Sequence, residues 1–257
     1  MEAKKVGFIG GGRVTRIILK AWQNRLLLPD NISVFDINSD VTGTLKGEFP
    51  SITVCDDPVT VAGQDVIFIA LHPPVIPETL EKIAGVIPKE SVIISLAPKI
   101  SIEKIALKIN SGNVVRMIPN ATSYVNKGYN PVCFAPGFQS GLKQSVMEML
   151  APLGHTFEVS EHKLEAYAIL SAMLPTYFWF QWVELGKLGP QMGLTEEETA
   201  WSIRESMIAA IEIMYDSGLK PEQVIDLIPV KPIGTAEKQI SEVYHTLLPA
   251  LFEKIKP

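Results

Sequence analysis

The sequence contains few residues of the kinds that build disulfides and metal sites. Two cysteines, Cys55 and Cys133, and four histidines occur among its 257 residues. The cysteines lie far apart, and no Cys-x-x-Cys or Cys/His pair has the spacing of a zinc site. We therefore expect reduced thiols, no disulfide and no metal ion, as in a cytoplasmic protein.

The sequence also lacks an excess of positive charge. It has 23 lysines and arginines against 28 acidic residues, a net charge of −5, and no block of basic residues. Such a chain does not attract nucleic acid or an anionic membrane surface, so we expect neither as a partner. The N-terminus runs directly into an apolar segment and shows no signal-peptide pattern.

No hydrophobic run is convincing as a membrane span. The segment 166–183 carries no charge over 18 residues, which is the lower limit for a span. Ser171, Pro175, Thr176 and Gln181 interrupt it, so the sequence favours a buried helix and no membrane association.

What the sequence does have is a glycine run between an apolar strand and a helix. Val6–Ile9 predicts the strand, Gly10, Gly11 and Gly12 follow, and a helix is expected from about Arg13. Glycine permits a tight turn and a close approach of the backbone to a pyrophosphate, and a helix N-terminus presents free N–H groups to an anion. The sequence thus predicts a nucleotide-phosphate site at these glycines, Arg13 and Val14.

The third glycine position of the Gly-x-Gly-x-x-Gly pattern holds Thr15, a departure from the usual Gly or Ala. A second predicted strand, Ile32–Asp36, ends in an acid 26 residues after Gly10, near the offset of a ribose-binding carboxylate. Asp36 would repel a 2′-phosphate, and Ile37 stands where NADP-binding proteins commonly have a basic residue, so NAD(H) is favoured over NADP(H). The alternative is a glycine-rich turn in another kind of α/β protein.

Strands alternate with helices through the first half of the chain. Further strands are predicted at 52–55, 64–71, 91–96 and 114–118. Part of a short helix is expected at 44–48, and helices at 76–86 and around 102–109. The fold class is therefore α/β, with an N-terminal Rossmann-type doubly wound sheet that binds ligands beyond the carboxyl ends of its strands. The residues expected at that edge, besides the glycines and Asp36, are Ala70, Leu71, His72, Pro73, Ala97, Pro119 and Asn120.

The pattern changes near residue 160. Strands at 131–134 and 156–159, flanking a helix at 140–150, are expected to close the sheet. Only helices are predicted beyond them, at 163–173, 175–188, 196–216, 221–227 and 237–252. We predict a dinucleotide-binding domain at 1–160 and an all-α C-terminal substrate and dimerisation domain at 161–257.

Several motifs resemble pyrroline-5-carboxylate reductases over nearly the whole chain. Gly7–Gly12 and Asp65–Ala70 fit the family's nucleotide domain, with a His-Pro following where the family has Lys-Pro, and Val115–Asn120 fits its Val-Arg-Met-Pro-Asn. Ser171–Tyr177 stands where the family has Ser-Gly-Ser-Gly-Pro-Ala-Tyr, and Lys231–Ala236 where it has Ser-Pro-Gly-Gly-Thr-Thr.

The resemblance implies NAD(P)H-dependent reduction of a cyclic imine carboxylate by a homo-oligomer built on its helical domains. It also implies that Ser171, Pro175, Gly234 and Thr235 bind the substrate. The family's second threonine is a candidate proton donor; Ala236 occupies its position, which leaves Thr235. Lys231 could pair with a substrate carboxylate, and His72 could contact the cofactor or donate a proton. The alternatives are that Thr235 caps the last helix and that His72 is a turn residue.

An aromatic run, Tyr177–Phe180 with Trp182, surrounds its helix rather than lying on one stripe. Such a helix needs burial on all sides, so we expect a homodimer or larger assembly through the C-terminal helices. Two other functions stay open. Glu161-His162 with Ser171 and Pro175 also resembles prephenate and arogenate dehydrogenases, so the second possibility is a dehydrogenase of a hydroxy or cyclohexadienyl acid. The third possibility is a nucleotide sensor without catalysis.

Overall fold

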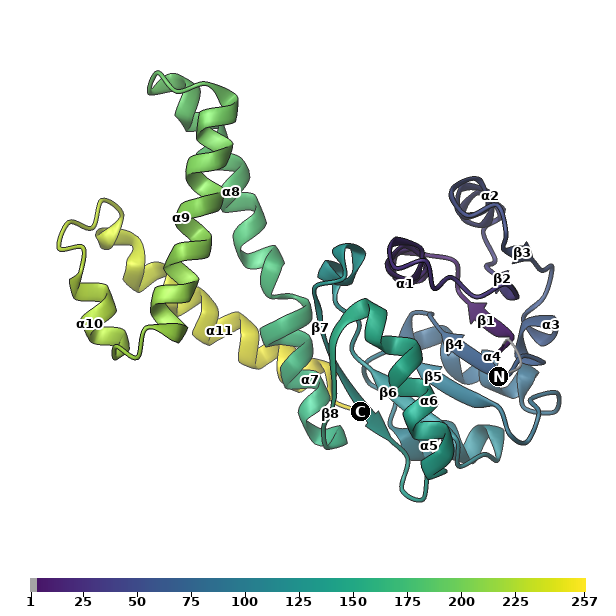
Figure 1. Ribbon diagram of the computed structural model, residues 1–257. Helices are drawn as coiled ribbons and strands as arrows, with labels where there is room; N and C mark the ends of the chain where they lie inside the picture. The colour runs from purple at the N-terminus through teal and green to yellow at the C-terminus, as the bar shows by residue number, and fades with distance from the viewer. Residues whose placement is uncertain (1–3) are drawn as a thin grey trace. The chain divides into compact units, whose positions relative to one another are not determined.

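The computed structural model describes residues 4–257, and these form two compact units (Figure 1). The first contains the residues up to Ala172 together with Phe252–Pro257, and the second contains Met173–Leu251. Within residues 4–257, no helix combines the length and apolarity that crossing a membrane requires.

The first unit is built on an eight-stranded sheet of order β3-β2-β1-β4-β5-β6-β7-β8. The six strands from β1 to β6 run parallel to their neighbours, β7 is antiparallel to β6, and β8 is parallel to β7. The chain order therefore reverses between β1 and β4, the position at which doubly wound sheets bind ligands. The strands are β1 (Val6–Ile9), β2 (Ile32–Phe35), β3 (Thr53–Val54), β4 (Val66–Ile69), β5 (Val92–Ser95), β6 (Val114–Met117), β7 (Gly128–Phe134) and β8 (Gly154–Glu158).

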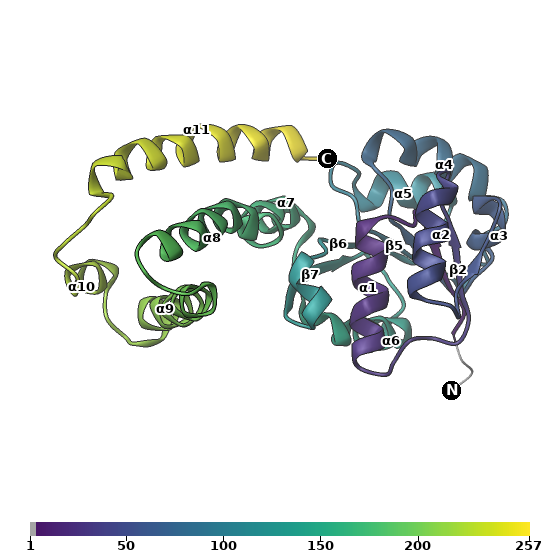
Figure 2. The same ribbon diagram turned by 90° about the horizontal axis from the view of Figure 1, so that it is seen from above.

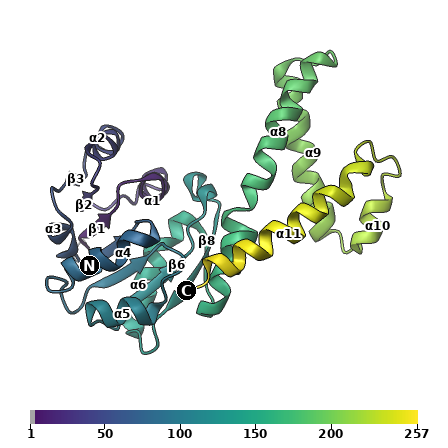
Figure 3. The same ribbon diagram turned by 180° about the vertical axis from the view of Figure 1, so that it is seen from behind.

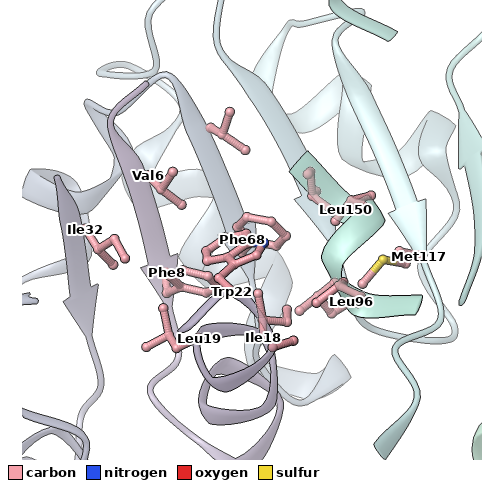
Figure 4. Close-up of a cluster of buried hydrophobic side chains, with 14 of the residues drawn as sticks. Val6, Phe8, Ile18, Leu19, Trp22, Ile32, Phe68, Leu96, Met117 and Leu150 are labelled. Carbon is pink, nitrogen blue, oxygen red and sulfur yellow. The ribbon is translucent and has the colours of Figure 1, made fainter. Parts of the chain in front are cut away.

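Helices cover the sheet on both faces, which is why the central strands read as unbroken apolar runs. On one face, Phe8 stacks on Phe68 with ring centroids 4.6 Å apart, and Trp22 of α1 packs against both (Figure 4). Alternate strand residues such as Ile67 and Ile69 are buried on the other face, since successive strand side chains point to opposite sides. Figure 2 shows α4 and α5 on one side of the sheet and α6 on the other. These helices are α1 (Arg13–Asn24), α2 (Ser39–Glu48), α3 (Pro58–Ala62), α4 (Ile76–Ile83), α5 (Ile102–Ile109) and α6 (Ser140–Leu150).

The predicted α/β class with a helical C-terminal part is confirmed, and the structure adds two local details. The predicted helical segment 44–48 is the second half of α2, which begins at Ser39 because the Asn38 side chain accepts the Asp40 N–H at 3.0 Å and caps the helix. The sequence reading also missed α3, which Asp57 caps through the Thr60 N–H at 2.8 Å.

The segment after β8 is less regular than the single helix expected at 163–173. A 3₁₀ turn at Glu161–Lys163 leads into α7 (Leu164–Tyr167), and Ala168–Ala172 is π-helical. The boundary predicted between residues 160 and 161 marks the change from strands to helices, whereas residues up to Ala172 remain compact with the sheet.

The second unit contains α8 (Leu174–Gln191), α9 (Glu196–Asp216), α10 (Pro221–Asp226) and most of α11 (Glu237–Ile255). Helices α8 and α9 run side by side (Figure 3). Their close approach depends on Gly189, because a Cβ there would lie 2.0 Å from Thr199 Oγ1. Trp179 and Phe180 in the aromatic run are 44% and 62% exposed, so a single chain does not bury the run as a helix core would.

Candidate nucleotide-binding site

The glycine turn after β1 is shaped by its first glycine. Gly10 has φ +105°, and a Cβ at this position would lie 2.3 Å from the Ala70 carbonyl oxygen. Its N–H donates to the Phe35 carbonyl at 2.7 Å. Only glycine fits this position, so the turn brings the backbones of three neighbouring strand ends together.

Thr15, the departure from the glycine pattern, closes the same turn. Its side chain is fully buried, and its hydroxyl donates to the Gly10 carbonyl at 2.5 Å. The threonine therefore replaces a close helix-to-strand contact with a hydrogen bond across the turn, and the local geometry of the motif is retained.

Helix α1 starts immediately beyond the turn and has Gly12 as its N-cap. Glycine has no side chain with which to cap the helix, so the first-turn N–H groups of Arg13 and Val14 remain available to an anion. The positive end of the helix dipole and the Arg13 guanidinium favour negative charge at the same place. These features are compatible with a pyrophosphate, the anion that the sequence predicts at this turn.

The carboxylate of Asp36 faces the glycine turn from the end of β2. Its Oδ2 accepts the Gly11 N–H at 2.8 Å, and its Oδ1 accepts the Asn38 N–H at 3.0 Å. A Cβ on Gly11 would lie 3.4 Å from the Asp36 Cβ, so the two residues touch. This arrangement orients the carboxylate beside the phosphate site, where a ribose with two free hydroxyls would donate to it.

A hollow of about 640 Å³ opens beside the turn, between the starts of α1 and α2. It brings together five of the predicted residues and five that sequence reasoning missed. The predicted residues are Gly11, Gly12, Arg13, Val14 and His72. The others are Arg16, Asp40, Val41, Thr44 and Leu45.

The missed residues had a signal in the sequence. Those on α2 repeat at a spacing of four and so share one helix face. That signal is visible only once the helix is known to begin at Ser39, because the predicted segment 44–48 does not reach Asp40 and Val41.

The other predicted strand-end residues lie where parallel strands place them, at the carboxyl ends of β4, β5 and β6. Ala70, Leu71 and Pro73 follow β4, and Ala97 follows β5 and is buried. Pro119 follows β6. His72 is exposed and starts the 3₁₀ turn Pro73–Val75, so both its turn role and a contact with a ligand are compatible with its position.

Two predicted residues from different sites bond to each other. Asn120 Nδ2 donates to the Ser171 carbonyl at 3.3 Å and to its hydroxyl at 3.2 Å, and that hydroxyl donates to the Tyr129 carbonyl at 3.0 Å. Asn120 Oδ1 accepts the N–H and the hydroxyl of Thr122. Both side chains are buried with these bonds made, so the structure supports a role for Asn120 and Ser171 in fixing the end of β6.

Arg116 lies just before this strand end and is ion-paired. It is 1% exposed, and it pairs with Glu161 at 2.8 Å and Glu165 at 2.5 Å. Glu161 also accepts the Ile102 N–H at 2.7 Å, which ties α5 to the same cluster. Arg116 therefore links β6 to α7 and, through Glu161, to the start of α5.

The remaining predicted residues belong to the second unit. Pro175 lies in the first turn of α8. Gly234 and Thr235 form a 3₁₀ turn that continues into α11, and Lys231 Nζ lies 3.9 Å from Glu237 Oε1. Thr235 is exposed, and within residues 4–257 its hydroxyl makes no hydrogen bond, so the alternative in which Thr235 caps α11 is not seen. The catalytic and substrate-binding roles of these second-unit residues stay predictions.

Within the same residues, no cluster of three or more His, Cys, Asp or Glu side chains could hold a metal ion. Together, the sheet order and the glycine turn define a Rossmann-type fold with a helical second unit. Residues 5–99 match the family model described as "NADP oxidoreductase coenzyme F420-dependent".

Over its whole length the chain is similar to pyrroline-5-carboxylate reductases. It is 25% identical to that of Corynebacterium melassecola over 242 residues, covering 93% of this chain and 89% of the relative. The Methanosarcina acetivorans protein is 22% identical over 257 residues, covering 98% and 94%. The crystal structure of Plasmodium falciparum pyrroline carboxylate reductase with NADP bound matches with a TM-score of 0.84 at 21% identity, covering 100% and 98%. The resemblance found in the motifs is confirmed, and so is the fold.

Proposed function

We propose that the chain is an NAD(P)H-dependent oxidoreductase that reduces the C=N bond of a cyclic imine carboxylate, pyrroline-5-carboxylate or a close relative. The carrying observation is the glycine turn with Asp36 beside it, in a chain that matches pyrroline-5-carboxylate reductases from end to end. When bound, the dinucleotide supplies the hydride that the imine carbon accepts.

Different residues of this chain would bind the dinucleotide, bind the imine and supply the proton. The first-turn N–H groups of α1 and Arg13 would bind the pyrophosphate, and Asp36 would orient the ribose. Thr235 would place a hydroxyl near the imine nitrogen and Lys231 a cation near the carboxylate, with His72 as the alternative proton source. These roles rest on motif positions.

We further propose that NADH is preferred to NADPH. Asp36 accepts hydrogen bonds from two backbone N–H groups, and Ile37 beside it is 95% exposed and offers no cation. A 2′-phosphate next to that carboxylate would be disfavoured by a few kcal/mol in a partly buried site. Because the similar Plasmodium protein was crystallised with NADP bound, the affinities of this chain for NADH and NADPH should be measured side by side.

A homodimer is proposed on the exposed apolar surface of the second unit. A groove between α8 and α9 is lined largely by apolar side chains, among them Trp179, Trp182 and Met207. A second copy would cover it, since a patch of this kind is unusual on a monomer. The free thiols of Cys55 and Cys133 fit a reducing compartment such as the cytoplasm.

The test is an assay of the purified full chain with NADH and a panel of cyclic imine carboxylates, following the absorbance of the reduced nicotinamide. Pyrroline-5-carboxylate or a near relative should be turned over. Binding of NADH with no turnover of any imine would favour the sensor alternative, and turnover of prephenate or a hydroxy acid in the reverse direction would favour the dehydrogenase alternative.

A further inference from the structure

Two arginines line the hollow beside the glycine turn, and they differ in whether they are paired. Arg13 and Arg16 lie on successive turns of α1 and both border the hollow. Arg16 Nε lies 2.5 Å from Glu48 Oε2, whereas within residues 4–257 Arg13 has no carboxylate partner. Only one of the two cations is therefore free to meet a ligand.

The carboxylate that pairs with Arg16 belongs to α2, the helix that lines the hollow together with α1. Glu48 is the last residue of α2, on the helix that also contributes Asp40 and Thr44 to the lining. Its hydrogen bond and its charge raise the pKa of the Arg16 guanidinium. The guanidinium also lies 5.8 Å from the centroid of the Tyr124 ring, so two neighbours orient it.

The charged side chains around the hollow bear on the choice between NADH and NADPH, which differ by a 2′-phosphate. Asp36 lies in the short loop between β2 and α2, so the ribose that it would bind lies next to the lining formed by α2. A 2′-phosphate on that ribose brings about two further negative charges and needs arginine donors to hold it. Asp36 and Asp40 oppose it, and among the described residues that line the hollow Arg13 is the one arginine without a carboxylate partner to offset them.

We propose that Glu48 is a specificity-determining residue: by holding Arg16, it withdraws a cation that would otherwise bind a 2′-phosphate, and so favours NADH. The inference rests on the proposed dinucleotide binding and adds a second control of cofactor choice beyond Asp36. Glu48 touches Arg16 rather than the ligand, so it acts through the orientation and charge of the arginine.

The experiment measures Kd for NADH and NADPH by fluorescence titration of the full-length chain and its Glu48→Gln and Glu48→Ala variants. Without the Glu48 carboxylate, Arg16 can bind the 2′-phosphate, and Kd for NADPH should fall about tenfold, as expected from one added charge-assisted hydrogen bond. Kd for NADH should change less than about twofold. Adding Arg16→Gln to either variant should abolish the gain.

Glu81→Gln is the matched control. Glu81 is an exposed carboxylate that pairs with Lys108 on α5, away from the hollow, and its loss changes the net charge of the protein by the same amount. Both Kd values should match those of the unmodified chain. An equal gain in Glu81→Gln would mean that overall charge, rather than Arg16, sets the affinity.

The titrations distinguish a failure of the proposed function from a failure of the inference about Glu48. A chain that binds neither dinucleotide overturns the proposed function. A chain that binds NADH but keeps the same NADPH-to-NADH ratio in both Glu48 variants overturns this inference and leaves the proposed function standing, as does a gain that persists without Arg16.

Discussion

Arg116 and Glu165 form an ion pair that solvent does not reach. Arg116 Nη2 lies 2.5 Å from Glu165 Oε1, and their side chains are 1% and 2% exposed. Arg116 is on β6 and Glu165 on α7, so the pair joins the sheet to the first helix of the C-terminal part. A buried pair of this kind contributes little on balance, but losing one partner leaves a buried charge uncompensated.

We therefore expect Glu165→Leu to lower the free energy of unfolding by about 3 kcal/mol, even though Glu161 still pairs with Arg116. Urea denaturation followed by tryptophan fluorescence measures the change. Glu78→Gln, which removes the exposed partner of Lys82, is the control and should have no measurable effect. Equal stability of Glu165→Leu and the unmodified chain would contradict a structural role for the pair.

Gly10→Ala should destabilise the first unit and abolish NADH binding. The new Cβ would meet the Ala70 carbonyl oxygen at 2.3 Å in a backbone conformation with φ +105°, so the turn must move. Isothermal titration with NADH and a thermal melt report the two effects. Gly141→Ala, on α6 with open space around the position, should bind NADH normally and gain about 0.5–1 kcal/mol of stability. Normal NADH affinity in Gly10→Ala would remove the turn from the nucleotide site.

The loop before α11 is tested by Thr235→Ala and Lys231→Ala. Loss of the Thr235 hydroxyl should lower kcat at least about tenfold with NADH affinity unchanged, and Thr235→Ser should restore most of the activity. Loss of the Lys231 charge should chiefly raise the KM for the imine carboxylate. If both alanine variants had the kinetics of the unmodified chain, the loop would lie outside the active site and His72 would be the proton source to test.

The proposed homodimer depends on the groove between α8 and α9. Light scattering at micromolar concentration should give twice the mass of one chain or more, and Trp179→Glu should shift it toward a monomer, since a charge in an apolar interface is costly. Leu107→Glu alters an exposed apolar residue of the first unit and should leave the mass unchanged. A monomeric mass for the unmodified chain would exclude the assembly.

Cys133 provides a pH-dependent prediction. Burial raises the pKa of its thiol from an ordinary value near 9 to about 11, with the charge of Glu161 adding to the shift. A raised pKa stabilises the fold below the unfolded-state value, and that stability is lost as the pH rises through the folded-state value. The free energy of unfolding should thus fall by about 2 kcal/mol more between about pH 8.5 and pH 11 in the unmodified chain than in Cys133→Val. Parallel pH profiles for the two proteins would contradict the assigned shift.

The sequence by itself determined the central sheet, the glycine turn and the place of Asp36 at the end of the second strand. These depend on short-range rules: apolar runs form strands covered on both faces, and Gly10 permits a positive φ that no side chain tolerates. Helix limits were less certain where a cap decided them, as Asn38 does for α2. The irregular segment at Ala168–Ala172 read as an ordinary helix, because apolar spacing alone does not distinguish π from α turns.

Tertiary structure decided the contacts between residues distant in the chain. Asn120 and Ser171 had been assigned to different ligands, and packing brings them into one buried hydrogen bond. The pairing of Arg16 with Glu48 depends on how α1 and α2 approach each other, and local sequence does not encode that approach. Motif spacing reports what the backbone does over a few residues, whereas the charges that face a ligand are set by which helices pack together.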